Sequence, residues 1–211
     1  MPLFGRKREP EEWAGPTVTG LAEHAASQGW DQLPARPFDG YLEDAVHEVA
    51  RVLYHGRPPF TYFRPGRSSF QDAWGGTADG MRFAVANAWT SISDDLKPMS
   101  VCALEIPAPL NILQIRPASY PPFGFGWPVP VNPGFDSQFT VLARDGNAAL
   151  AVLTPEVREL IAASGDWIFL AERQRFACLT LTPFGSADEV VARVGQVRAI
   201  YAAIPAAAPR P

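Results

Sequence analysis

Few residues in this sequence have side chains that do chemistry: three histidines, two cysteines and scattered carboxylates. The stretch that begins His47-Glu48 is close to the H-E-x-x-H motif, in which two imidazoles one helical turn apart hold a zinc ion. Arg51 stands where the second imidazole would have to be. We therefore predict no metal site here, and interpret these residues as a solvated charge ladder on a helix.

The two cysteines also lack what a nucleophile needs. Cys102 and Cys178 lie in apolar, alternating stretches, and all three histidines precede residue 56. A reactive cysteine requires a lowered pKa and a partner base. The sequence contains neither a phosphate-binding loop nor a dinucleotide-binding fingerprint. We predict two buried free thiols, no catalytic residue and no cofactor, and we expect that the protein is not an enzyme.

Aromatic residues provide the best candidate for a contact surface. Residues 117–134 are rich in proline and glycine and carry four rings, those of Tyr120, Phe123, Phe125 and Trp127. Because such a segment is stiff, its rings can anchor a protein partner or enclose an apolar ligand. The alternative is that this loop folds back over an exposed sheet edge.

The N-terminal segment, residues 1–16, has the pattern of a flexible tail that is first basic and then acidic. Phe4, Arg6, Lys7 and Arg8 are candidates for contact with an anionic membrane surface, where each cation contributes about 1 kcal/mol. We expect weak direct membrane binding at most. No apolar run approaches the roughly 18 residues of a membrane span, and no signal peptide is recognisable. The prediction is a cytoplasmic protein, at most peripheral to the inner face of the membrane.

Composition and charge narrow the class of protein further. Apolar residues make up 47 % of the chain and charged residues 19 %, which is ordinary for a globular domain with a real core. The net charge of -4 provides no long-range attraction for a polyanion. We therefore expect no nucleic-acid partner.

Helices are predicted from apolar residues at helical spacing and from their capping signals. Thr17 or Thr19 caps the first helix and Gly29 ends it. Thr154-Pro155 begins a later helix that Gly165 ends. Ser186 and Glu189 form a capping box. The predicted helices span about residues 17–28, 41–54, 147–152, 155–164 and 187–204.

Strands are predicted where the apolar period changes to two. Residues 69–75 and 81–91 flank a turn that contains Asp79-Gly80, a hairpin signal. In residues 83–89 bulky side chains alternate with alanines, which indicates that another layer packs close to the alanine face. Pro107 and Pro109 are expected to break the ladder between two strands. The further predicted strands span residues 60–64, 100–106, 111–115, 135–143, 167–170 and 176–182, the last two joined by a turn.

Adjacent strands, with helices grouped at the N-terminus and in the C-terminal third, predict an α+β fold with a mainly antiparallel sheet. We expect one domain over residues 17–205, with a βαββα subdomain at about 135–205. Residues 206–211 are expected to be a disordered tail.

Several segments resemble a family of uncharacterised actinobacterial proteins. The segments are LAEHAASQGW (21–30), WGGTADGMRFAVANAW (74–89), VCALEIPAPLNILQI (101–115) and FDSQFTVLARDGNAALAVLTP (135–155). They contain an A-x-x-x-G-W helix end, a G-T-x-x-G hairpin, an L-x-x-P-A-P-L turn and an F-x-x-x-F-x-V strand, none of which is catalytic. Members of that family often carry an N-terminal membrane anchor, where this sequence has only a short basic tail.

The same segments are also similar to the cytoplasmic part of the trehalose monomycolate transport factor family, accessories of envelope-lipid export. That resemblance implies an adaptor that docks on a membrane transporter. Residues 41–64 look inserted relative to the family, so no family property is carried onto them.

The leading functional hypothesis is a non-enzymatic cytoplasmic accessory or adaptor protein. It acts through protein–protein contacts, with a membrane or cell-envelope component as the candidate partner. The alternative is a binding protein for a small apolar or lipid-like ligand, held between the sheet and residues 117–134. The last helix is also compatible with a homodimer.

Overall fold

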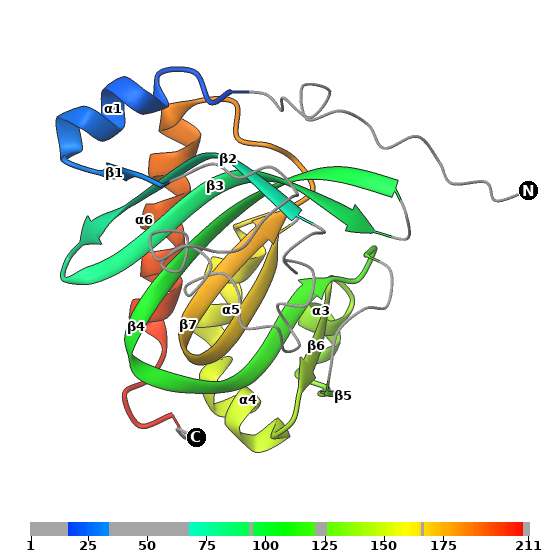
Figure 1. Ribbon diagram of the computed structural model, residues 1–211. Helices are drawn as coiled ribbons and strands as arrows, with labels where there is room; N and C mark the ends of the chain where they lie inside the picture. The colour runs from blue at the N-terminus through cyan, green and yellow to red at the C-terminus, as the bar shows by residue number, and fades with distance from the viewer. Residues whose placement is uncertain (1–16, 34–67, 93–94, 121–125, 166, 209–211) are drawn as a thin grey trace, which may run out of the picture.

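The computed structural model describes residues 17–33, 68–92, 95–120, 126–165 and 167–208 (Figure 1). Several predictions lie outside these residues: the membrane-contact residues Phe4, Arg6, Lys7 and Arg8, the helix 41–54, the strand 60–64, and the loop residues Phe123 and Phe125. The elements are α1 (Leu21–Gln28), β1 (Asp31–Gln32), β2 (Ser68–Ala78), β3 (Met81–Ile92), β4 (Asp95–Pro117), β5 (Trp127–Pro128), α3 (Pro133–Asp136), β6 (Phe139–Ala143), α4 (Gly146–Val152), α5 (Pro155–Ala162), β7 (Ile168–Thr180) and α6 (Ala187–Ala203).

The described strands form one antiparallel sheet in the order β1-β2-β3-β4-β6-β5, with β7 also paired to β4. In Figure 1, α5 and α6 lie behind this sheet and α1 crosses one end of it. The expected α+β fold with a mainly antiparallel sheet is confirmed. No helix of the described residues is long and apolar enough to cross a membrane.

The 23-residue strand β4 passes through the two prolines that were expected to break it. Its pairing with β7 shifts register between Glu105 and Leu110 and again before Leu113. Pro107 and Pro109 lie between these shifts, and the register of β4 with its partner strands skips residues 106–109. The predicted break in the ladder is therefore confirmed, whereas the prediction of two separate strands is wrong, because β4 continues through the prolines as one bent strand.

The bend of β4 encloses β7, which itself turns back at residues 171–175 (Figure 1). Ser100 to Glu105 pair with one arm of β7, and Leu110 to Ile115 pair with the other. The two strands that were predicted over residues 167–170 and 176–182 are thus arms of one strand along a shared partner. Tyr201 of α6 fixes the bend, because its hydroxyl oxygen lies 3.3 Å from the Ala108 amide nitrogen and 3.4 Å from the Ala108 carbonyl oxygen.

The hairpin between β2 and β3 forms at the predicted turn. Asp79 (φ 47°) and Gly80 (φ 75°) both adopt the left-handed conformation that a two-residue hairpin turn favours. β2 has an additional irregularity at Asp72, which has φ 46°. The Asp72 carboxylate accepts a hydrogen bond from the Val18 amide at 2.6 Å, and this contact ties the segment before α1 to the sheet.

Capping chemistry places most helix ends where the sequence predicts them. The Thr154 hydroxyl accepts from the Val157 amide, and Ser186 accepts from the Glu189 amide. The Glu189 carboxylate in turn accepts from the Gly185 amide at 2.7 Å. At α1 the expectation fails, because the N-cap is Gly20 with no side-chain cap, whereas the predicted Gly29 ends the helix at φ 65°.

Two further expectations are corrected by local structure. The predicted strand 135–143 begins instead with α3, because the Asn132 side chain caps Phe135 and Pro133 supplies the first helical residue. The expected disordered tail also begins too early: residues 206–208 form a turn, and Ala208 packs into the core. The short strand β1, which pairs with Trp74 and Gly75, was not predicted.

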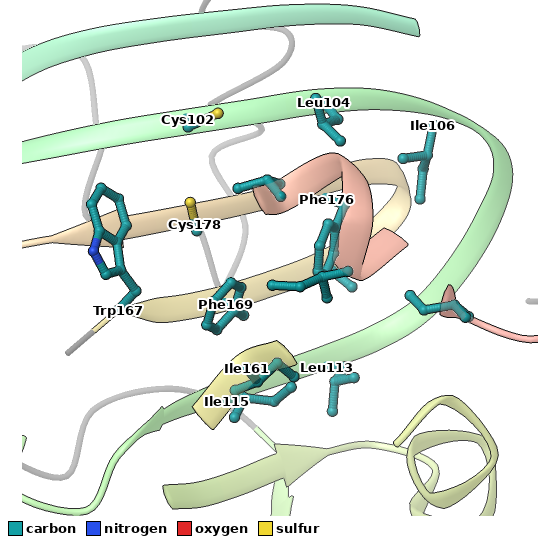
Figure 2. Close-up of a cluster of buried hydrophobic side chains, with 14 of the residues drawn as sticks. Cys102, Leu104, Ile106, Leu113, Ile115, Ile161, Trp167, Phe169, Phe176 and Cys178 are labelled. Carbon is teal, nitrogen blue, oxygen red and sulfur yellow. The ribbon is translucent and has the colours of Figure 1, made fainter. Parts of the chain in front are cut away.

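The sheet has two apolar faces, which we call the first face and the second face. The first face carries the main core, made by alternate residues of β3, β4 and β7 together with α1, α5 and α6. Figure 2 shows part of it, with Phe169, Phe176 and Ile161 among the clustered side chains. The second face carries Ala84, Met99, Val101, Ala103, Ile168, Leu170, Ala177 and Leu179, all at most 4 % exposed.

Candidate functional site

The described part of the aromatic loop presents one exposed ring at the edge of the sheet. Trp127 is 76 % exposed, the largest exposure among the large apolar side chains of the described residues. It lies on β5, whose Trp127 and Pro128 pair with Ala143 and Leu142 of β6. The loop therefore does cover a sheet edge, as the alternative interpretation expected, and it also places an indole at the surface.

Glycine at position 126 is what lets this strand approach β6. Gly126 has φ 88°, and a Cβ on it would lie 2.6 Å from the carbonyl oxygen of Ala143. A side chain there would both strain the backbone and clash with a strand that cannot move away. The glycine therefore determines where Trp127 sits.

The chain after Trp127 is held by a series of contacts. The Val129 amide donates to the Val141 carbonyl at 3.0 Å, and the Val129 side chain is buried. The Val131 amide then lies 3.1 Å from both carboxylate oxygens of Asp136. These contacts fix the backbone on the C-terminal side of the exposed indole.

The other described ring of the loop has a different environment. Tyr120 is half-buried and packs against the apolar cluster of the second face. Its amide donates to the Pro117 carbonyl at 3.1 Å, so a turn fixes its position. The structure thus assigns the two described candidates to different places: Trp127 faces solvent at an edge, and Tyr120 borders the second face.

The two cysteines lie buried on neighbouring strands of the sheet. Cys102 and Cys178 are directly opposite each other on β4 and β7, and both are free and fully buried (Figure 2). Burial, together with the neighbouring Cys102, raises the pKa of the Cys178 thiol well above its usual value. A raised pKa keeps the group as a thiol, which is a poor nucleophile. Within the described ranges no cluster of three His, Cys, Asp or Glu residues could hold a metal ion.

Two polar arrangements were not predicted from the sequence, and both are structural. The Asn87 side chain bonds both backbone groups of Phe184, at 2.8 and 3.1 Å, and accepts from Ser100. The Arg193 guanidinium lies 3.8 Å from the centroid of the Trp167 ring, and its burial lowers its pKa. Both arrangements fix α6 and the chain before it on the first face. Neither arrangement could be predicted from a sequence pattern, because the partners lie far apart along the chain.

Comparison with known proteins identifies a structural neighbour. No family model and no curated protein matches the sequence. The structure is similar to the crystal structure of the mycobacterial trehalose monomycolate transport factor A, TtfA, with a TM-score of 0.54. The match covers 92 % of this chain and 99 % of that chain.

The two chains share a fold. Their sequences are 14 % identical, so the similarity concerns architecture alone. It supports the resemblance to the transport factor family at the level of fold, and the resemblance to the uncharacterised actinobacterial family stays a prediction.

Proposed function

We propose that this protein is a non-enzymatic accessory of cell-envelope lipid transport that works as an adaptor, with the β5 edge as its contact surface. The observation that carries the proposal is Trp127, an indole 76 % exposed on a rigidly held edge strand. The fold shared with TtfA, a protein named as a trehalose monomycolate transport factor, supplies the cellular context.

A fixed, exposed tryptophan is well suited to binding a protein. Tryptophan is enriched among the residues that dominate interface energies, where truncation costs about 2 kcal/mol or more. The cost of binding includes ordering the contact residues. The hydrogen bonds of Val129 and Val131 have already ordered the chain after Trp127, so that part of the cost is reduced.

The partner we propose is a membrane protein of the envelope-lipid export machinery, reached from the cytoplasmic side. Phe4, Arg6, Lys7 and Arg8 would add a weak attraction to the anionic surface beside that partner. One aromatic ring and three cations are too weak to anchor the protein stably to a membrane by themselves. The adaptor therefore depends on its protein contact for its location.

The test places a photo-crosslinking amino acid at position 127 and expresses the full chain in an actinobacterial host. We expect crosslinks to an integral membrane protein, identified by mass spectrometry. In a separate pulldown, Trp127→Ala should reduce recovery of that protein about tenfold or more, which corresponds to about 1.4 kcal/mol.

Val191→Ala is the matched control, because Val191 is also an exposed apolar residue, at 40 %, but lies on α6. It should leave recovery unchanged. Equal recovery with Trp127→Ala and wild type, or crosslinks to no membrane protein, would contradict the proposal. Unchanged melting temperatures for both variants show that the fold is intact.

A second candidate function is binding of a small apolar or lipid-like ligand beside the same loop. Tyr120 favours it, because this loop residue packs against an apolar sheet face. The hypothesis predicts a bound lipid in protein purified from the natural host. Native mass spectrometry that finds only the 23.0 kDa chain would rule it out.

A further inference from the structure

We propose that the second face of the sheet is a docking surface for this chain's own residues 34–67, and that the apolar side of residues 41–54 lies against it. The inference begins with burial. The eight side chains of this face are at most 4 % exposed in a single chain. Their cover therefore belongs to this chain and not to a second copy.

The described residues supply only part of that cover. The described apolar side chains packed against the cluster from outside it are Leu33, Tyr120 and Leu181. The helices α1, α5 and α6 contribute their apolar residues to the core of the first face instead. Eight buried side chains spread over three strands need a larger apolar partner than three half-buried residues.

The chain leaves the described fold on this very face. The Leu33 amide donates to the Ala73 carbonyl at 2.8 Å. A Cβ placed on Gly75 would lie 3.0 Å from the Leu33 side chain, so Leu33 sits directly over that glycine. Gly75 pairs with Ala84, a member of the second-face cluster. Residues 34–67 thus begin at the rim of the face and return to the same sheet at Ser68.

The face has a shape that a helix can approach closely. The smallest residues of this face form one row across β2, β3, β4 and β7. They are register partners in turn: Gly75, Ala84, Ala103 and Ala177. Ala86, Val101 and Leu179 form the bulkier row beside it. The alternation in β3 predicted that another layer packs close to these alanines.

The sequence of residues 41–54 complements that row. Its apolar residues recur at helical spacing: Leu42, Ala45, Val46, Val49, Ala50 and Leu53. Fourteen helical residues span about 21 Å, which exceeds the roughly 15 Å across four neighbouring strand segments, namely β3, β4 and the two arms of β7. Thirty-four residues are ample for this helix and both connections. Residues 1–16 join the described chain at Thr17, before α1, whose apolar residues lie in the core of the first face. Residues 121–125 are too few to cover three strands.

Methionine oxidation provides a local test in the full chain. Met99 lies on the second face, whereas Met81 lies at the half-buried hairpin end. In wild type we expect hydrogen peroxide to oxidise Met99 at least about tenfold more slowly than Met81. In Val46→Asp/Val49→Asp the Met99 rate should rise toward the Met81 rate. The control His47→Asn/Arg51→Gln changes the polar side and should leave Met99 protected.

Thiol labelling reports whether the variant has unfolded, because Cys102 and Cys178 lie on the first face. Protected thiols with a protected Met99 in Val46→Asp/Val49→Asp would overturn the proposal. Two other results would also overturn it. One is Met99 protection that depends on protein concentration, and the other is Met99 protection that disappears when a bound lipid is removed.

If the thiols of Val46→Asp/Val49→Asp are labelled as well, the variant has unfolded, and crosslinking in the otherwise unchanged chain tests the proposal instead. A photo-crosslinking residue at position 46 should react with peptides that contain Ala84, Ala103 or Ala177, and one at position 48 should not. Crosslinks from position 46 to other parts of the chain, or none, would overturn the proposal.

Discussion

The two faces of the sheet are made from alternate residues of the same strands, yet they are built on different scales. The first face presents Phe169, Phe176 and Leu104 to α5 and α6, and large side chains fill the space between layers. The second face presents a row of small residues, with Ala84, Ala103 and Ala177, beside larger ones such as Val101 and Leu179. Side-chain volume sets how near the next layer can lie, so one sheet supports a thick core on one side and a close contact on the other.

Truncation on the first face should have the largest effect. Phe176 is 2 % exposed and its ring packs with Phe169 and Tyr201. Phe176→Ala should lower the free energy of unfolding by about 3 to 5 kcal/mol, because it removes apolar contacts and leaves a cavity. Urea unfolding measures the loss. The exposed Val191→Ala is the control, expected within about 0.5 kcal/mol of wild type. A loss below 1 kcal/mol would mean that the first face is not the main core.

Enlargement on the second face should have an intermediate effect. Ala103 is fully buried in the row of small residues. Ala103→Leu should cost about 1 to 3 kcal/mol, because the added volume pushes against whatever lies on the row. The same urea experiment measures it, with Ala22→Leu on the exposed side of α1 as control. If Ala103→Leu leaves the free energy of unfolding unchanged, the second face can accommodate a larger side chain, and the two faces do not differ in how closely they are packed.

Loss of one hydroxyl at the bend should have the smallest effect. Tyr201→Phe keeps the ring beside Phe176 and removes only the polar contacts with Ala108. We expect a cost of about 0.5 to 1.5 kcal/mol. Hydrogen exchange should show faster exchange at Ala108, with little change in β3. Unchanged exchange at Ala108 would mean that the prolines hold the bend without α6.

Much of the fold was predictable because its signals are local. Asp79-Gly80, Thr154-Pro155 and the Ser186/Glu189 pair each specify a turn or cap within four residues. The predicted α1 cap is wrong because Thr19 lies in a bridge with Ser186, distant in sequence, and the helix begins only after Gly20, which has no side chain to cap it. α3 was missed because the apolar spacing of residues 135–141 suits a strand, while Asn132 and Pro133 start a helical turn first.

The candidate site was predicted only in part. Aromatic residues in a proline-rich loop pointed to a contact surface, and Trp127 is exposed as that idea requires. The sequence did not separate Trp127 from Tyr120, because burial depends on which strand each residue meets. Gly126 could not be singled out either: its role comes from Ala143, a strand partner seventeen positions away.

The sequence by itself determined the fold class, the hairpin turn, most helix ends and the small-residue side of β3, since these depend on propensity, capping and periodicity over a few residues. Only the tertiary structure decided that β4 continues through Pro107 and Pro109, that β7 nests inside its bend, and that β5 covers the edge of β6. The physical reason is that a strand is stabilised by hydrogen bonds to partner strands that are distant in the chain. A proline cannot donate to a ladder, but the partner strand determines whether the chain ends there or bends and pairs again, as β4 does with β7.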